Sequence, residues 1–331
     1  MKQLSFTADA QQAGERLDKL LGTLAVDLSR SYLTQLIRDG QVTVCGRTQK
    51  SSYRVRENDV LVISVPEEQQ ADILPENIPL DILYEDADVL VVNKPKGMVV
   101  HPAPGHTEGT LVNAVLHHCG SSLSGINGVL RPGIVHRIDK DTTGSVLICK
   151  NDAAHRSIAA QLKTHSITRK YYAIVFGVIR EDALTIQGRI GRDPKDRKKM
   201  AVVSAPAGKE AVTHVRVLER FRKFTYVECE LETGRTHQIR VHMASAGHPL
   251  LGDAVYAGNR KTPFPGLKGQ TLHAGVLGFR HPSSGEYIET RCALPPYFEE
   301  LLQKLRAEGP ASDRRELSQK PDGRMDSRKR S

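Results

Sequence analysis

The sequence predicts an α+β protein with a mixed, mainly antiparallel sheet, preceded by a small module of helices followed by strands. Apolar runs with strand character begin at Leu80, and several follow one another as hairpin-like pairs. Helical segments lie between only some of these strands, a pattern that favours a mixed sheet over a doubly wound parallel one. The chain has 331 residues, enough for two domains.

The first 66 residues have the pattern of a separate small module. Leucines between positions 17 and 24 recur with the i, i+3, i+4, i+7 spacing of one helix face. A second helix follows, with Ser29 or Ser31 as its N-terminal cap and Gly40 at its end. Alternating residues from Val42 and the apolar run 60–63 predict strands.

The main domain is predicted over residues 80–306, after an acidic, proline-punctuated linker at 67–79. The last segment, 307–331, has Leu317 and Met325 as its only large apolar side chains, so we expect it to be disordered. The main domain's predicted strands lie at 82–84, 89–92, 145–148, 172–175, 214–217 and 226–231, and its predicted helices at 107–118, 152–164 and 236–246.

The positive charge is concentrated in the main domain. The chain has 47 basic and 38 acidic side chains, a net charge of +9. Residues 76–306 carry a net charge of +8, whereas residues 1–75 carry −1. Such a distribution favours an acidic partner, most simply a nucleic acid.

Several cellular settings are disfavoured by the sequence. No apolar stretch approaches the roughly 18–20 residues of a membrane span, and the N-terminus lacks the apolar run of a signal peptide. The five cysteines are odd in number and widely spaced, which indicates free thiols in a reducing compartment. We therefore expect a cytoplasmic protein without a membrane partner.

The densest cluster of charged residues spans 131–144, directly before an apolar strand. Two carboxylates, Asp139 and Asp141, lie there among arginine, lysine and histidine. A carboxylate beside a cation stays ionised and oriented, which suits a nucleophile. Asp141 precedes Thr-Thr-Gly and fits a turn acceptor, so Asp139 is the better chemical candidate. Composition alone favours a structural ion-pair loop over catalysis.

A second cluster, residues 231–243, places a strand end before a predicted helix. Thr236 can cap that helix. A helix N-terminus with Arg235 beside it can bind phosphate. Arg240 would project near the same end, although a lone helix arginine is usually solvated.

Two further stretches combine cations with turn or strand signals. Residues 93–102 carry Lys94 in a Pro/Gly loop, which fits a phosphate contact or a plain surface turn. In residues 167–173, Arg169 leads into an apolar strand with Tyr171. That tyrosine fits half-buried packing or stacking on a nucleic-acid base.

Motifs for cofactors and metals are missing from the sequence. It contains no GxGxxG, Walker A or GxSxG pattern. His237 and His242 are five residues apart, not the four of HExxH, and no glutamate lies between them. We therefore expect neither a cofactor nor a metal ion.

Five ordered motifs together resemble the RluA family of pseudouridine synthases. They lie at residues 93–97, 131–144, 169–173, 234–253 and 272–282. The second contains His-Arg-Ile-Asp where the family has His-Arg-Leu-Asp, a volume-conserving exchange. The resemblance implies the pseudouridine synthase fold and the isomerisation of uridine in RNA, without a cofactor, a redox step or a metal.

The N-terminal module resembles an S4 RNA-binding domain at residues 15–18 and 42–47. Because the module is net acidic, its RNA affinity would come from a local face with Arg30, Arg38 and Arg47. A structural or protein-contacting role stays open. The resemblance thus divides the chain into an S4-like domain (1–66), a linker (67–79), a catalytic domain (80–306) and a tail (307–331).

Within the family, residues 139–144, 200–202 and 211–213 are most similar to the RluD subgroup. That subgroup modifies large-subunit (23S) ribosomal RNA. The S4-like module argues against the short tRNA enzymes that lack it, and leaves the RluC subgroup open. The implied partner is ribosomal RNA, free or in assembling 50S particles, and the enzyme is expected to be a monomer.

The resemblance also implies residue roles. Asp139 matches the catalytic aspartate, and Arg240 matches the arginine that pairs with it. Tyr171 matches the tyrosine that stacks on the uracil and assists proton movement at C5. His136 and Arg137 match residues that open the stacked RNA. Phosphate contacts are expected from Lys94, Lys96, Arg169, Lys170 and Arg235.

Two other classes of function stay open. A non-catalytic RNA-binding or ribosome-assembly factor would use the same basic domain and S4-like module. A glycosidase would use Asp139 and Asp141 as paired carboxylates, although such enzymes hold the pair about 5–10 Å apart, usually from separate elements.

Overall fold

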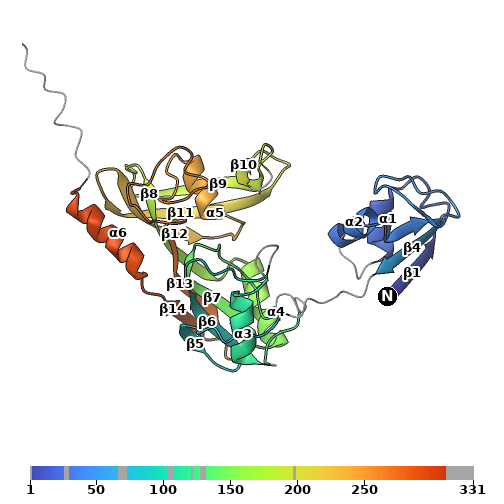
Figure 1. Ribbon diagram of the computed structural model, residues 1–331, viewed down its shortest axis with the longest axis horizontal. Helices are drawn as coiled ribbons and strands as arrows, with labels where there is room; N and C mark the ends of the chain where they lie inside the picture. The colour runs from blue at the N-terminus through green and yellow to red at the C-terminus, as the bar shows by residue number, and fades with distance from the viewer. Residues whose placement is uncertain are drawn as a thin grey trace, which may run out of the picture. The chain divides into compact units, whose positions relative to one another are not determined.

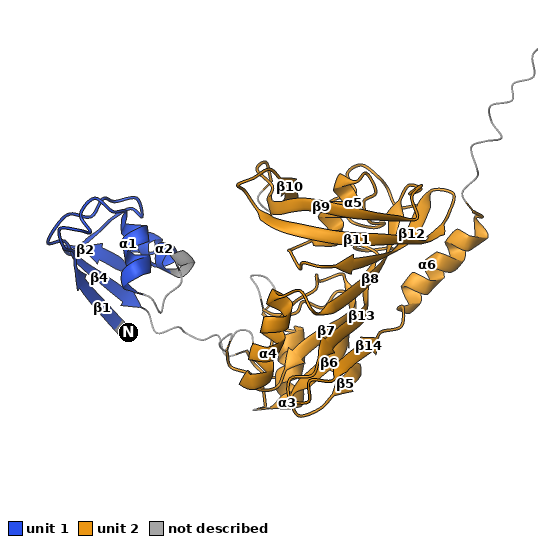
Figure 2. Ribbon diagram, turned by 180° about the vertical axis from the view of Figure 1, so that it is seen from behind, with its two compact units in different colours: residues 1–71 blue, residues 72–331 orange. Residues whose placement is uncertain are grey.

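The computed structural model describes residues 2–25, 30–65, 73–102, 107–120, 122–126, 132–196 and 199–310. The chain divides into two compact units, residues 1–71 and 72–331 (Figure 2). Two expected segments lie partly outside the described residues. These parts are residues 67–72 of the expected linker and residues 311–331 of the expected tail. No helix in the described ranges is long and apolar enough to cross a membrane.

The N-terminal unit packs two helices on a four-stranded antiparallel sheet (Figure 1). Its core consists of the apolar faces that the sequence predicts, including Leu17, Leu21, Leu33 and Leu61. The first strand has no counterpart among the predicted elements. The elements are β1 (Lys2–Thr7), α1 (Leu17–Leu24), α2 (Arg30–Arg38), β2 (Val42–Val44), β3 (Arg47–Thr48) and β4 (Val60–Val65), with sheet order β1-β4-β2-β3.

The second unit is built on one 10-stranded mixed sheet (Figure 1). Its strands are β5 (Ile82–Glu85), β6 (Val89–Lys94), β7 (Thr143–Cys149), β8 (Thr168–Phe176), β9 (Ala183–Arg192), β10 (Met200–Val203), β11 (Lys209–Arg220), β12 (Phe224–Leu231), β13 (Leu272–Arg280) and β14 (Tyr287–Arg291). Its helices are α3 (Leu111–Cys119), α4 (Asp152–Lys163), α5 (Gln238–Ser245) and α6 (Pro296–Ala307).

The strand pairing confirms the predicted mixed, mainly antiparallel sheet. The order is β10-β9-β11-β12-β8-β13-β7-β6-β5, and β14 pairs with β13. The pair β13–β7 is parallel and the other pairs are antiparallel. Gly144 makes the parallel contact possible, because its φ of 107° and the closeness of Ala274 leave no room for a side chain.

Helices cover both faces of this sheet. Alternate residues of β8 point to opposite sides, as strand geometry requires: Tyr171 and Ala173 pack in one core with Ile239 of α5. Ile174 packs on the opposite side with Phe298 of α6. In the same way, β7 packs on one face against α3 and on the other against α4. The face shared by α3 and α5 carries the site described next.

Candidate active site

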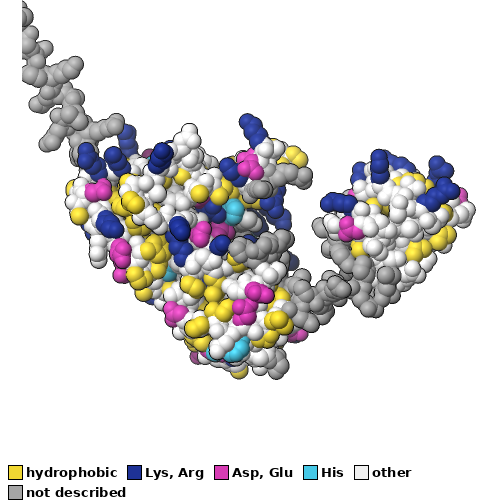
Figure 3. All heavy atoms as spheres, viewed as in Figure 1, with side chains coloured by type: hydrophobic (Ala, Val, Ile, Leu, Met, Phe, Trp, Pro, Cys, Tyr) yellow, Lys and Arg dark blue, Asp and Glu magenta, His cyan; other side chains and the backbone are white. Residues whose placement is uncertain are grey.

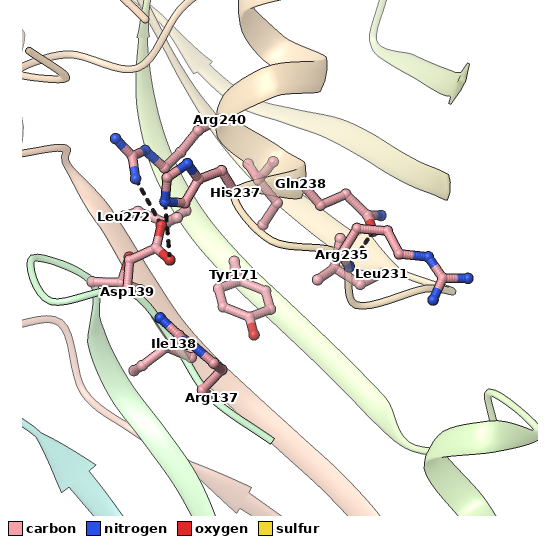
Figure 4. A pocket seen from close by; sticks show the side chains of 12 residues that line it. Arg137, Ile138, Asp139, Tyr171, Leu231, Arg235, His237, Gln238, Arg240 and Leu272 are labelled. Atoms are coloured by element: carbon pink, nitrogen blue, oxygen red, sulfur yellow. Dashed lines mark hydrogen bonds and ion pairs between the residues drawn. The ribbon is translucent and has the colours of Figure 1, made fainter. Parts of the chain in front are cut away.

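A pocket opens between the loop before β7 and the start of α5, over strands β8, β12 and β13 in the middle of the large sheet (Figure 4). Residues from four of the five sequence motifs line it, including Arg137, Asp139, Tyr171, Arg240 and Leu272. The fold therefore brings together the three residues that the resemblance implies for catalysis.

The loop before β7 presents Asp139 to this pocket. Ile134 forms a β-bridge with Ile148, and His136 Nε2 accepts a hydrogen bond of 2.9 Å from the Leu147 N–H, so the segment is fixed along β7. Burial, together with the nearby Arg169 cation, lowers the pKa of His136 to about 4, which keeps the ring a neutral acceptor.

Helix α5 supplies the cation that holds Asp139. Arg240 Nη1 donates to Asp139 Oδ2 at 2.9 Å. The other edge of the guanidinium binds Asp253, with Nε donating to Oδ2 at 2.7 Å and Nη2 to Oδ1 at 3.0 Å. Burial opposes the charge on Arg240, but Asp253 and Asp139 raise its pKa above the ordinary value. Asp139 is thus oriented by a permanent cation.

His237 lies on the other side of Asp139, with Nε2 3.8 Å from Oδ1. Its Nδ1 is 2.8 Å from the Tyr256 hydroxyl, which also accepts a hydrogen bond from the Met200 N–H. Burial lowers the pKa of His237 below its ordinary value, although the Asp139 carboxylate opposes this effect. Its backbone has a φ of 56°, a left-handed conformation that is uncommon for histidine.

The sequence patterns assign no role to His237, Tyr256 or Asp253. Asp253 belongs to the fourth motif, and a carboxylate near the motif's arginine was the available signal. The spacing of His237 and His242 bears only on a metal site. Its left-handed conformation also corrects the predicted helix start, because α5 begins at Gln238 after His237, not at a Thr236 cap, and His237 provides no side-chain cap.

Tyr171 lines the pocket, with Asp139 to one side of its ring and Arg137 below it in Figure 4. It is 8% exposed. Burial raises the pKa of its hydroxyl above the ordinary value. The Arg169 cation opposes this effect, and the Asp139 carboxylate adds to it. A ring at this depth offers a face for a planar base to stack on.

Lys94 is buried, which contradicts the expected surface position for a phosphate contact. Its side chain is 0% exposed, and Nζ donates to the carbonyl oxygens of Pro95, Met98 and Lys140 at 2.8–3.0 Å. Burial lowers its pKa to about 7. All three ammonium protons are used inside the protein, so Lys94 joins the first motif to the Asp139 loop.

The other expected phosphate contacts differ in exposure. Arg137 is exposed beside the pocket, with Nη1 3.4 Å from His101 Nε2. Arg235 is half-buried, and its Nε donates to the backbone carbonyl oxygen of Glu210. Arg169 is buried, which contradicts the expected surface contact. Lys170 is committed to ion pairs with two glutamates of β12. On the face that Figure 3 shows, the cations of this unit are scattered.

Asp141 does not line the pocket with Asp139. Its carboxyl group lies against Gly269, and its charge acts on Lys94 and Lys96. This separation removes support for a glycosidase with these two carboxylates as its acid and base. Among the described residues, no group of three or more His, Cys, Asp or Glu is arranged to hold a metal ion.

The N-terminal unit has its own shallow groove, between the end of α2 and residues 48–52. Arg38 and Lys50 line it, and Arg47 is exposed on β3. Arg30 is the first residue of α2, but its side chain lies outside the described residues.

Comparisons with known proteins agree with this architecture. The model of the RNA pseudouridylate synthase family matches residues 88–245, and the S4 domain model matches residues 15–61. The solved structure of human RNA pseudouridylate synthase domain containing 1 is 27% identical, with a TM-score of 0.54, and the match covers 72% of this chain and 98% of that one.

Two bacterial relatives match almost the whole chain. The uncharacterized RNA pseudouridine synthase YlyB of Bacillus subtilis is 55% identical over 93% of this chain and 100% of its own length. Ribosomal large subunit pseudouridine synthase D of Pseudomonas aeruginosa is 45% identical over 88% of this chain and 92% of its own length. The chain therefore belongs to the RNA pseudouridylate synthase family and is a pseudouridine synthase with an N-terminal S4 domain.

Proposed function

We propose that this enzyme isomerises specific uridines of large-subunit (23S) ribosomal RNA to pseudouridine, with Asp139 as the catalytic residue. One observation carries the proposal: the Asp139–Arg240 pair at 2.9 Å lies in the same pocket as Tyr171. The pair supplies an oriented carboxylate, and the ring supplies a surface for the base.

In the proposed reaction, Asp139 acts at the ribose and assists cleavage of the bond between C1′ and N1. The uracil turns over Tyr171, and C1′ then joins C5. The C5 proton leaves, its electron pair restores the C5=C6 bond, and N1 gains a proton. Product and substrate have the same atoms, so the reaction needs no external donor or oxidant. Tyr171 is proposed to accept the C5 proton.

The choice of ribosomal RNA rests on the relatives and on charge. Several relatives that are 42–45% identical are named for the large ribosomal subunit, and residues 76–306 carry a net charge of +8. Arg137, Arg235 and Arg38 are the proposed contacts to the phosphate backbone. Free RNA or an assembling 50S particle in the cytoplasm would be the partner of a monomeric enzyme.

The proposal is tested with 23S RNA that carries 5-tritiated uridine. The wild-type protein should release tritium, and carbodiimide mapping should locate pseudouridine at a few positions. Asp139→Asn should reduce release by about 1,000-fold or more, while exposed Asp182→Asn should behave as wild type. Undiminished release by Asp139→Asn would contradict the role of Asp139. Release from transfer RNA alone would contradict the substrate.

A further inference from the structure

We propose that Arg169 is a positioning residue for Tyr171, whose phenolate form its guanidinium stabilises during the reaction. The inference deepens the proposed function and rests on it, because it concerns the step in which Tyr171 accepts the C5 proton. It also replaces the expected role of Arg169 as a phosphate contact.

Arg169 and Tyr171 share one face of β8. Residues two apart on a strand point to the same side, and both side chains are buried, at 6% and 8% exposure. The Tyr171 hydroxyl points away from Arg240 (Figure 4). Arg240 is already bonded to Asp139, so it does not serve this hydroxyl.

The guanidinium of Arg169 is held but not neutralised. Nη2 donates to the Glu232 carbonyl oxygen at 3.0 Å, and Nε has no hydrogen-bond partner. Nη1 lies against Gly234, where an added Cβ would come within 2.6 Å of it. Glycine at 234 therefore gives Arg169 the space it occupies. No carboxylate lies within ion-pair distance of Arg169 among the residues that the structure describes.

The groups around Arg169 add no negative charge. Burial lowers the pKa of Arg169. Tyr171 raises the pKa of Arg169, and the cation Arg235 lowers it. Arg169 in turn lowers the pKa of His136, which is neutral. A guanidinium buried without a carboxylate is costly, so its presence favours an anion that forms during function.

Two anions could fill this role, an RNA phosphate or the Tyr171 phenolate. Arg169 does not line the pocket and is 6% exposed, so a phosphate outside would not reach it without rearrangement. The phenol, in contrast, is its neighbour on the same strand face. Burial raises the pKa of Tyr171, and Arg169 counteracts that effect.

The proton balance of the step is simple. Tyr171 reacts as the phenolate and takes the proton from C5, and the C–H electron pair restores the C5=C6 bond. N1 receives a proton from water, and Tyr171 later returns its proton to solvent. Arg169 keeps its own proton throughout.

The test compares Arg169→Met with Arg169→Lys, which keeps the charge. Single-turnover tritium release is measured against pH with saturating 23S RNA, and RNA affinity is measured against salt. Arg216→Met is the matched control, because Arg216 is an exposed strand arginine paired with Glu228 at 3.2 Å. If Arg169→Met does not fold, Arg169→Gln replaces it.

The rate of tritium release should increase with pH, and we expect Arg169→Met to shift this increase to a pH about one unit higher. At neutral pH the variant should release tritium about tenfold more slowly. Its RNA affinity, and the dependence of that affinity on salt, should not change. Arg169→Lys should restore much of the wild-type pH profile. Weaker RNA binding with a salt slope reduced by about one would identify a phosphate contact and overturn the inference. An unmoved pH profile would also overturn it. Lack of release by the wild type would refute the proposed function instead.

Discussion

Asp253 binds the Nε–Nη2 edge of Arg240 and leaves Nη1 to reach Asp139. The two contacts to Asp253 measure 2.7 and 3.0 Å, and the contact to Asp139 measures 2.9 Å. Asp253 is 1% exposed and also accepts hydrogen bonds from the N–H groups of Val255 and Tyr256. The guanidinium therefore cannot rotate without losing buried bonds, and this rigidity sets where the Asp139 carboxylate lies.

Asp253→Asn should slow turnover about 100-fold, because misplacement of a catalytic group by about 1 Å has an effect of that size. RNA affinity should stay within about twofold, since Asp253 is buried and not at the surface where phosphate contacts form. Single-turnover rates and filter binding measure the two quantities. Asp182→Asn is the control, because Asp182 pairs with Arg220 at 2.6 Å on the surface. A loss of affinity without a loss of rate would contradict the positioning role.

Lys94→Met should destabilise the protein but leave RNA binding intact. The substitution leaves three buried carbonyl oxygens without their donor, which we expect to reduce the free energy of unfolding by about 2–4 kcal/mol. Chemical denaturation measures this. The salt slope of RNA binding should not change, whereas Arg137→Met at the exposed edge of the pocket should reduce it by about one. A reduced slope for Lys94→Met would restore the phosphate role.

The sequence located the elements whose signals are local. Apolar runs identified β7 and β8 because strand periodicity depends on neighbouring residues. Helix α6 was missed although Pro296 stands in its first turn, and its apolar residues Phe298, Leu301, Leu302 and Leu305 have helical spacing. In that case the signal was present in the sequence.

The contacts that define the site are not local, and the sequence could not predict them from residue patterns. Asp139 and Arg240 lie 101 residues apart and meet only through the sheet. Lys94 has the composition of a surface turn, yet three carbonyl oxygens enclose its ammonium group. Arg169 looked like a phosphate contact, and only its place on the inner face of β8 shows that it is buried. The motif resemblance supplied the pairing that spacing alone could not.

His136 should make the fold less stable in acid. Its pKa in the folded protein is about 4, below the ordinary value of 6.5. As the pH falls from 6.5 to 4, the unfolded chain binds a proton that the folded chain does not, so the free energy of unfolding decreases across this window. We expect His136→Gln to reduce the difference between pH 7 and pH 4 by about 2 kcal/mol. Denaturation at both pH values, with His165→Asn as an exposed control, measures it; an unchanged difference would contradict the buried neutral ring.

The Tyr256 hydroxyl should act on catalysis through His237. This oxygen accepts from the Met200 N–H, and we expect its own proton to be donated to His237 Nδ1, with the ring proton then on Nε2, the nitrogen 3.8 Å from Asp139. Tyr256→Phe removes that hydroxyl but keeps the ring that lies 5.0 Å from the Arg240 guanidinium.

We expect Tyr256→Phe to slow single-turnover release about tenfold without a change in RNA affinity. His237→Asn, which tolerates the left-handed backbone at this position, should slow it at least as much. In the double variant the loss of the hydroxyl should have no further effect, because the two groups act as one unit. Additive losses in the double variant would show that Tyr256 acts on Arg240 or on the fold, not through His237.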